Sequence, residues 1–156
     1  MPKITPFLWF DNQAEEAAKF YVSVFKNSKI LDVSRYQEGG PGPAGQAMVV
    51  SFELDGQKLN ALNGGPHFTF SEAISFVVDC EDQAEVDHFW DKLSAGGKTS
   101  QCGWLKDRYG LSWQVVPTAL PRILSNPDPV KARRAMDAMM KMTKLDIATL
   151  EAAAAG

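Results

Sequence analysis

The sequence predicts an α+β fold, built from two βαβββ modules and a helical extension, and three observations support this prediction. Two segments, FDNQAEEAAKFY and VDCEDQAEVDHFW, share an Asp, a Gln-Ala-Glu and an aromatic pair, with Ala14 and Ala84 70 positions apart. Short apolar stretches alternate with Asp-Gly and Gly-Gly turn signals. The chain has 156 residues, 45% hydrophobic and 22% charged, as expected for one globular domain. Two copies of one unit predict a pseudo-symmetric domain with a functional groove.

The first module covers about residues 1–64 and begins with an apolar strand. A helix is expected over residues 13–26, where apolar residues recur at helical spacing. Asp11 or Asn12 can cap that helix, because a short oxygen side chain accepts from free first-turn amides. Asp55-Gly56 is a tight-hairpin signal between the last two strands. The expected strands are Ile4–Phe10, Ile30–Tyr36, Ala47–Leu54 and Gln57–Asn63, with a glycine- and proline-rich loop at 39–45.

The second module covers about residues 70–117 and follows Gly64-Gly65-Pro66, a sequence that interrupts regular structure. It repeats the same order: a strand at Ala73–Asp79, a helix at Asp82–Ala95, and strands within 98–101, 103–106 and 111–116.

Residues 118–156 are expected to be helical. The predicted helices are Leu120–Leu124, Val130–Met142, which follows Pro129, and Asp146–Ala155. An apolar stripe on the second of them is a packing face or a dimer contact; it consists of Ala132, Met136, Met139 and Met140.

Composition and charge exclude several classes of partner. The formal net charge is −3 and there is no basic patch, which argues against a nucleic-acid partner. No apolar run approaches the ~20 residues that span a bilayer, and the N-terminus lacks the apolar core of a signal peptide. Cys80 and Cys102 fit a reduced protein better than a disulfide framework. We therefore expect a cytoplasmic protein without a membrane partner.

Three segments carry a resemblance to a known family: AEEAAKFYVSVF, ALNGGPHFTFSEAISFVVDCEDQAEVDHFWDKLSAGG and QCGWLKDRYGLSWQVVP. They resemble the PhnB-like family, often labelled 3-demethylubiquinone-9 3-methyltransferase, of the vicinal oxygen chelate superfamily. That superfamily includes glyoxalase, bleomycin-resistance proteins and extradiol dioxygenases. The tail NPDPVKARRAMDAMMKM is also similar to the family. The resemblance implies one domain of tandem modules with open, curved sheets, and often a homodimer.

Metal-using members of the superfamily hold a His early in the first strand and a carboxylate late in the fourth, and repeat this pair in the second half. The resemblance places these positions here at Thr5 and Ala73, counted back from Asp11 and Asp79, and at Gln114. The first-half equivalent of Gln114 is Asn60 or Leu62. Divalent metals bind through anionic oxygen, imidazole or thiolate, and these residues supply none of them. We therefore predict no metal site and no cofactor.

Strand alternation places Thr5, Phe7 and Trp9 on one face of their strand, and the resemblance directs that face into the cleft. The predicted ligand-binding residues are Thr5, Phe7, Trp9, Asn60, Ser75, Trp104 and Gln114. This aromatic, weakly polar set suits a neutral or planar organic ligand. The alternative is that the tryptophans only fill the groove.

His67 and Glu72 are the candidate catalytic residues, because each could act as a general base near the crossover between the modules. A turn histidine and a residue that only begins a strand are the alternatives. His88, on the second helix, is expected to be a surface or packing residue.

Three functions follow. The first is a metal-independent small-molecule-binding protein or enzyme of the glyoxalase/bleomycin-resistance type, with undefined activity. The second is the methyltransferase of the family label, although the glycines do not follow a parallel strand as in adenosyl-cofactor sites. The third is sequestration without chemistry. A metal-dependent lyase or dioxygenase is the remaining alternative.

Overall fold

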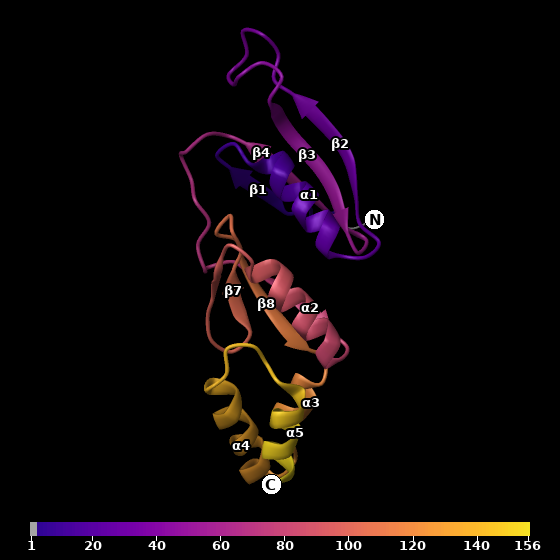
Figure 1. The fold of residues 1–156 in the computed structure, drawn as a ribbon, viewed down its shortest axis with the longest axis vertical. Coiled ribbons are helices and arrows are strands. Elements are labelled where there is room, and N and C mark those ends of the chain that lie inside the picture. The colour runs from indigo at the N-terminus through magenta and orange to yellow at the C-terminus, as the bar shows by residue number, and fades with distance from the viewer. Residues whose placement is uncertain (1–2) are drawn as a thin grey trace. The chain divides into compact units, whose positions relative to one another are not determined.

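The computed structural model describes residues 3–156 and divides into two compact units, residues 1–70 and 71–156 (Figure 1). Each unit contains one four-stranded mixed sheet and a helix in the order βαβββ, and three more helices follow in the second unit. The α+β class, the tandem modules and the helical extension predicted from the sequence are confirmed.

The first unit orders its sheet β1-β4-β3-β2. β1 runs parallel to β4, and the other neighbours are antiparallel. The structure confirms the predicted bounds of β3 and β4. Asp55 and Gly56 both have positive φ, 46° and 86°, as a tight hairpin turn requires. The elements are β1 (Phe7–Phe10), α1 (Ala14–Val24), β2 (Lys29–Arg35), β3 (Ala47–Leu54) and β4 (Gln57–Asn63).

Side-chain alternation gives this sheet one face packed on α1 and one opposite face. Leu8 and Phe10 are buried beside the α1 side, where Tyr21 stacks on Phe52 with ring centroids 6.3 Å apart. Phe7 points the other way and is 55% exposed. We call the face of each sheet that is turned away from its own module helix the open face.

The cap of α1 corrects the sequence prediction. Neither Asp11 nor Asn12 caps the helix; its N-cap is Gln13, which makes no side-chain capping bond. The Ala14 amide instead donates to Asn63 Oδ1, 2.8 Å away, and Asn63 Nδ2 donates to the Ala47 carbonyl at 2.9 Å. A buried side chain at the end of β4 therefore caps the helix and joins it to the sheet.

The second unit repeats the same topology, with its sheet ordered β5-β8-β7-β6. Here the cap is local: Asp82 accepts from the Glu85 amide at 2.9 Å. The buried Asp107 carboxylate fixes the turn before β8 by accepting from the Leu111 amide and the Trp113 indole. The elements are β5 (Phe76–Cys80), α2 (Gln83–Ser94), β6 (Lys98–Thr99), β7 (Trp104–Lys106) and β8 (Ser112–Pro117).

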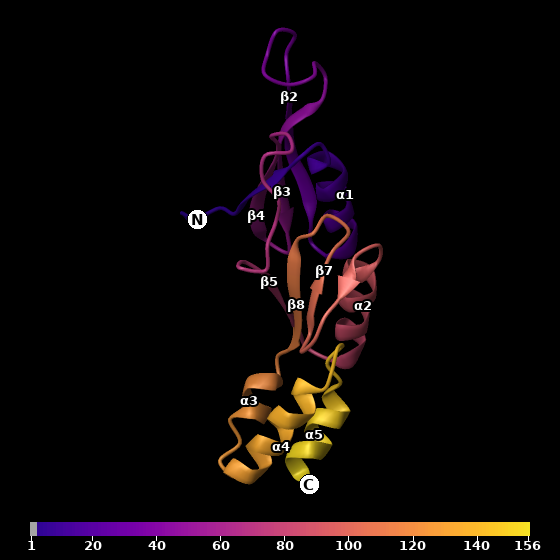
Figure 2. The same cartoon turned by 90° about the vertical axis from the view of Figure 1, so that its left-hand side faces the viewer.

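Three C-terminal helices form a small bundle within the second unit (Figure 2). They are α3 (Leu120–Leu124), α4 (Pro129–Met140) and α5 (Ile147–Ala155). A second hydrophobic core holds them together; its buried members are Ile123, Ala135, Leu145, Leu150 and Ala154. The amides of Cys102 and Gly103 donate to the carbonyls of Met142 and Thr143, which attaches the bundle near β7.

Only part of the predicted apolar stripe of α4 packs within the second unit, and the alternative of a dimer contact stays a prediction. Ala135 is the buried residue of this helix and Met139 packs beside it, whereas Met136 and Met140 are 39% and 55% exposed. Ala135 is buried in the cluster that also contains Ile123 and Leu150. Among the described residues, no helix is long and apolar enough to cross a membrane.

Candidate functional site

The strand registers define which residues of the two modules are equivalent. Phe10 and Cys80 end their strands in the same way, because their carbonyls accept from the amides of Gly64 and Thr118, respectively. β1 and β5 are therefore offset by 70 residues, so Ser75, not Ala73, is the partner of Thr5. Asp79 corresponds to Trp9 and not to Asp11, which corrects the equivalence inferred from the sequence repeat.

The same registers settle the choice between Asn60 and Leu62. Phe7 pairs with Asn60, and its equivalent Val77 pairs with Gln114. Asn60 is therefore the counterpart of Gln114. The four positions that hold metal ligands in the resemblance thus carry two hydroxyls, from Thr5 and Ser75, and two amides.

Three of these side chains, those of Asn60, Ser75 and Gln114, form hydrogen bonds with neutral partners in their own units. Gln114 Nε2 donates to Ser75 Oγ at 3.0 Å, and Ser51 Oγ donates to Asn60 Oδ1 at 2.7 Å. Among residues 3–156, no group of three or more His, Cys, Asp or Glu is placed to hold a metal ion. This donor set offers hydrogen bonds but neither an anion nor an imidazole.

Two aromatic residues, Phe7 and Trp9, share the open face of the first sheet with Asn60. The Trp9 indole donates to the Gly65 carbonyl at 2.9 Å and meets the Phe68 ring edge to face, with centroids 4.9 Å apart. Phe7 and its equivalent Val77 have similar exposure, 55% and 53%. Each open face therefore presents apolar surface next to an amide.

His67 and Glu72, the proposed bases, lie in different surroundings. His67 is exposed and its ring centroid is 6.4 Å from that of Trp9. Glu72 pairs with Lys106 at 2.5 Å, and this ammonium holds the pKa of the carboxyl below its usual range. A carboxylate held in this way is a weak base near neutral pH. His88 is exposed on α2 and contacts Phe89.

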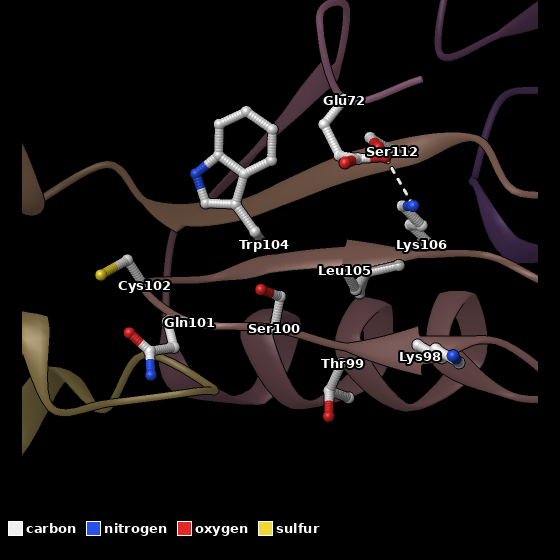
Figure 3. Close-up of a pocket in the computed structure, with 10 residues that line it drawn as sticks. All are labelled: Glu72, Lys98, Thr99, Ser100, Gln101, Cys102, Trp104, Leu105, Lys106 and Ser112. Atoms are coloured by element: carbon white, nitrogen blue, oxygen red, sulfur yellow. Dashed lines mark ion pairs between the residues drawn. The ribbon is translucent and has the colours of Figure 1, made fainter. Parts of the chain in front are cut away.

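A pocket of about 450 Å³ lies in the second unit (Figure 3). Trp104 lines it, and Glu72 and Lys106 form their ion pair there. Ser112 also lines it, is 1% exposed, and has no hydrogen-bond partner for its Oγ in the described structure. The remaining lining residues are Lys98, Thr99, Ser100, Gln101, Cys102 and Leu105.

Sequence reasoning selected Trp104 and Glu72 from this pocket and missed Lys98, Lys106 and Ser112. A signal for two of them was present, because residues two apart on a strand share a face. Lys106 thus lies on the face of Trp104, and Ser112 on the face of Gln114. Of the predicted residues, Thr5, Phe7, Trp9, Asn60 and His67 belong to the first unit, and Glu72, Ser75, Trp104 and Gln114 to the second.

Comparison with known proteins connects this architecture to one family. Residues 2–116 match a family model described as 3-demethylubiquinone-9 3-methyltransferase. A PhnB protein structure from Bacillus cereus, described by the same methyltransferase name, is 39% identical with a TM-score of 0.71, over 75% of this chain and 100% of that one. No protein with a curated function matches.

Two more distant structures share the fold. A glyoxylase/bleomycin resistance protein/dioxygenase domain from Frankia is 14% identical, with a TM-score of 0.51, over 75% of this chain and 92% of that one. The fosfomycin resistance protein FosX from Listeria monocytogenes is 11% identical, with a TM-score of 0.51, over 78% of this chain and 96% of that one.

Proposed function

The chain belongs to the 3-demethylubiquinone-9 3-methyltransferase, or PhnB-like, family of the glyoxalase/bleomycin-resistance type, and we propose that it is a small-molecule-binding protein that works without a metal ion. The observation that carries the proposal is the identity of the residues at the four positions where metal-using relatives hold their ligands. Thr5, Asn60, Ser75 and Gln114 occupy the places where the resemblance puts His and carboxylate ligands.

The chemistry of these groups favours an organic ligand over a metal ion. Neutral hydroxyls and amides bind divalent metals weakly in a water-accessible site, whereas they donate to and accept from organic polar groups. The Gln114–Ser75 hydrogen bond, 3.0 Å long, holds the amide in one orientation. Trp104 lies on the open face of the second sheet together with Gln114, and Phe7 and Trp9 lie on the open face of the first sheet together with Asn60. Each open face therefore fits a planar molecule with a polar edge.

The methyltransferase of the family description has less support from the fold. Nucleotide-type cofactors bind where a glycine-rich turn leads from a parallel strand into a helix. Here the turns from β1 to α1 and from β5 to α2 are Asp11–Gln13 and Glu81–Asp82, which contain no glycine. The glycine-rich loop of residues 39–45 instead joins the antiparallel strands β2 and β3. The proposal is therefore ligand binding rather than methyl transfer, with the activity left undefined.

A thermal-shift screen of the metal-free protein against aromatic and quinone-like metabolites tests the proposal. We expect at least one ligand to raise the melting temperature, and Gln114→Ala or Trp9→Ala to reduce that shift. Gln37→Ala, in an exposed loop, is the matched control and should preserve it.

Two measurements would contradict the proposal. Near-stoichiometric zinc, nickel or iron in the purified protein would overturn metal independence. Tight binding of S-adenosylmethionine by calorimetry would support methyl transfer instead.

The cellular setting is part of the same proposal. We place the protein in the cytoplasm, because both cysteines are free in the structure and the cytoplasm keeps thiols reduced. We also propose a homodimer, in keeping with the family resemblance.

A further inference from the structure

A row of polar side chains crosses three strands on the open face of the second sheet. Lys98 pairs with Lys106 between β6 and β7, and Lys106 pairs with Ser112 between β7 and β8. Residues directly opposite in antiparallel strands project from the same face, with Cβ atoms about 5 Å apart. Two ammonium groups and one hydroxyl therefore project together into the 450 Å³ pocket.

This row is arranged for an anion. Like charges directly opposite on a sheet repel each other, so a negative group between Lys98 and Lys106 is favourable. Ser112 is almost fully buried, and its Oγ has no partner among the described residues. Buried hydroxyls normally find hydrogen-bond partners, and an acceptor bound at the row would supply one.

Glu72 occupies part of this anion site. Its carboxylate pairs with Lys106 at 2.5 Å, and the two side chains remain 62% and 43% exposed, respectively. Exposed ion pairs contribute little stability, and Glu72 lies on the irregular segment before β5. A ligand carboxylate can therefore replace it at small cost.

Trp104 sets the shape of the remaining part of the ligand. It lies two residues before Lys106 on β7 and faces the same pocket (Figure 3). Successive side chains on one strand face are about 7 Å apart. This separation matches a carboxylate attached to an aromatic ring, since indole favours stacked or edge-to-face aromatic contacts.

We propose that this pocket binds an aromatic carboxylic acid, with its carboxylate on the Lys98–Lys106–Ser112 row and its ring against Trp104. The inference rests on the proposed function, because it names the ligand class for the open face of the second sheet. No bond is made or broken in this proposal.

Calorimetry on the full chain at low ionic strength, with 2-naphthoate and 2-naphthamide as probes, tests the inference. The two probes have the same ring and differ in charge. We expect naphthoate to bind about tenfold more tightly, as charge-assisted hydrogen bonds are stronger than neutral ones. Lys106→Gln should weaken naphthoate binding about tenfold and leave naphthamide binding unchanged, whereas Ser112→Ala should weaken naphthoate binding about threefold.

Glu72→Gln is the variant with the opposite expectation. It removes the competing carboxylate and should tighten naphthoate binding several-fold, a gain that misfolding would not produce. Lys92→Gln, on α2, removes the same charge as Lys106→Gln outside the pocket and should change binding less than twofold.

The inference is overturned if the two probes bind equally, if Lys106→Gln behaves as Lys92→Gln does, or if naphthoate does not bind at millimolar concentration. A neutral metabolite that stabilises the protein through Gln114 would, in any of these cases, leave the proposed function standing. Stoichiometric metal in the purified protein would contradict the proposed metal-independent function. The comparison of naphthoate with naphthamide would still test the carboxylate site.

Discussion

At the scale of single residues, Trp9 and Gly64 depend on each other. A Cβ on Gly64 would fall within the indole of Trp9, so only glycine allows the ring to pack against the backbone there. The same indole donates to the Gly65 carbonyl. The GGP turn, which the sequence marks only as punctuation, therefore positions an aromatic side chain of the open face.

Gly64→Ala should destabilise the protein by about 2 kcal/mol, because overpacking forces the ring or the turn to move. In the background of Trp9→Phe, whose smaller ring makes room, the same substitution should cost less than about 1 kcal/mol. Urea denaturation of the four proteins in this cycle measures the difference. Equal costs in both backgrounds would show that the turn itself, not the indole, requires glycine.

The two cysteines should differ in reactivity. Burial raises the pKa of the Cys80 thiol to about 12, and the side chain is fully buried. Because the thiolate is the reactive form, Cys80 should resist alkylation of the native protein at pH 8 and react only after unfolding. Mass spectrometry after iodoacetamide treatment checks this, with Cys102, which is partly exposed, as the internal comparison.

The raised pKa of Cys80 also predicts how the free energy of unfolding changes with pH. An unfolded thiol ionises near pH 9, whereas the folded one stays neutral up to about 12. The stability contributed by neutral Cys80 is therefore present below pH 9 and is lost as pH rises towards 12.

At the scale of elements, the two module helices begin in different ways. The Asp82 cap of α2 was predictable, because it lies next to the helix in the chain. The cap of α1 was not, since Asn63 is 49 positions away from the amide that it accepts from. Local sequence favoured Asp11 and Asn12, and only the sheet register brings Asn63 to the helix.

Asn63→Ala should lower the free energy of unfolding by about 3 kcal/mol, because two buried backbone groups lose their partner. Asn12→Ala should change it by less than about 0.5 kcal/mol, since Asn12 is exposed. Urea denaturation separates the two. A larger loss for Asn12→Ala would return the cap to the position predicted from the sequence.

Gln83 connects α2 to the C-terminal bundle. Its Nε2 donates to the Leu145 carbonyl at 3.1 Å and its Oε1 accepts from the Ile147 amide at 2.8 Å. Gln83→Ala should cost about 1–2 kcal/mol and accelerate hydrogen exchange in α5. Gln13→Ala changes the equivalent residue of the first module, which is exposed, and should leave α5 unaffected.

At the scale of the whole molecule, the two modules of the sequence repeat share the same order of strands and helix, but equivalent side chains have different partners. Glu15 pairs with Arg35, whereas its counterpart Glu85 accepts from the Glu81 amide. The βαβββ order, β3, β4 and α3 could all be predicted, because alternation, turn chemistry and helical spacing are local signals. The pocket row of Lys98, Lys106 and Ser112 could not, because it depends on pairing across three strands.

The register error has a physical reason. Matching Asp11 with Asp79 displaced the strands by two residues, and a displacement of two leaves every side chain on its original face. Face assignments such as that of Phe7 therefore remained correct, although the partner of Thr5 was misplaced from Ser75 to Ala73.

Assembly is the prediction at this scale. We expect size-exclusion chromatography with light scattering to give twice the chain mass of 17.1 kDa at micromolar concentration, because the apolar open-face residues Phe7 and Val77 are more than half exposed in the single chain. A sharp monomer peak across that range would remove the homodimer.

The attachment of the C-terminal bundle has a consequence for how such chains diversify. The amides of Cys102 and Gly103 bind the carbonyls of Met142 and Thr143, and backbone groups are the same in every residue except proline. The family match ends at residue 116, before this bundle begins. The joint is nevertheless not free to vary, because Gly103 has a φ of 86° and a Cβ there would lie 2.8 Å from the Val115 carbonyl oxygen. A bundle appended at this place therefore requires a glycine beside the strand that receives it.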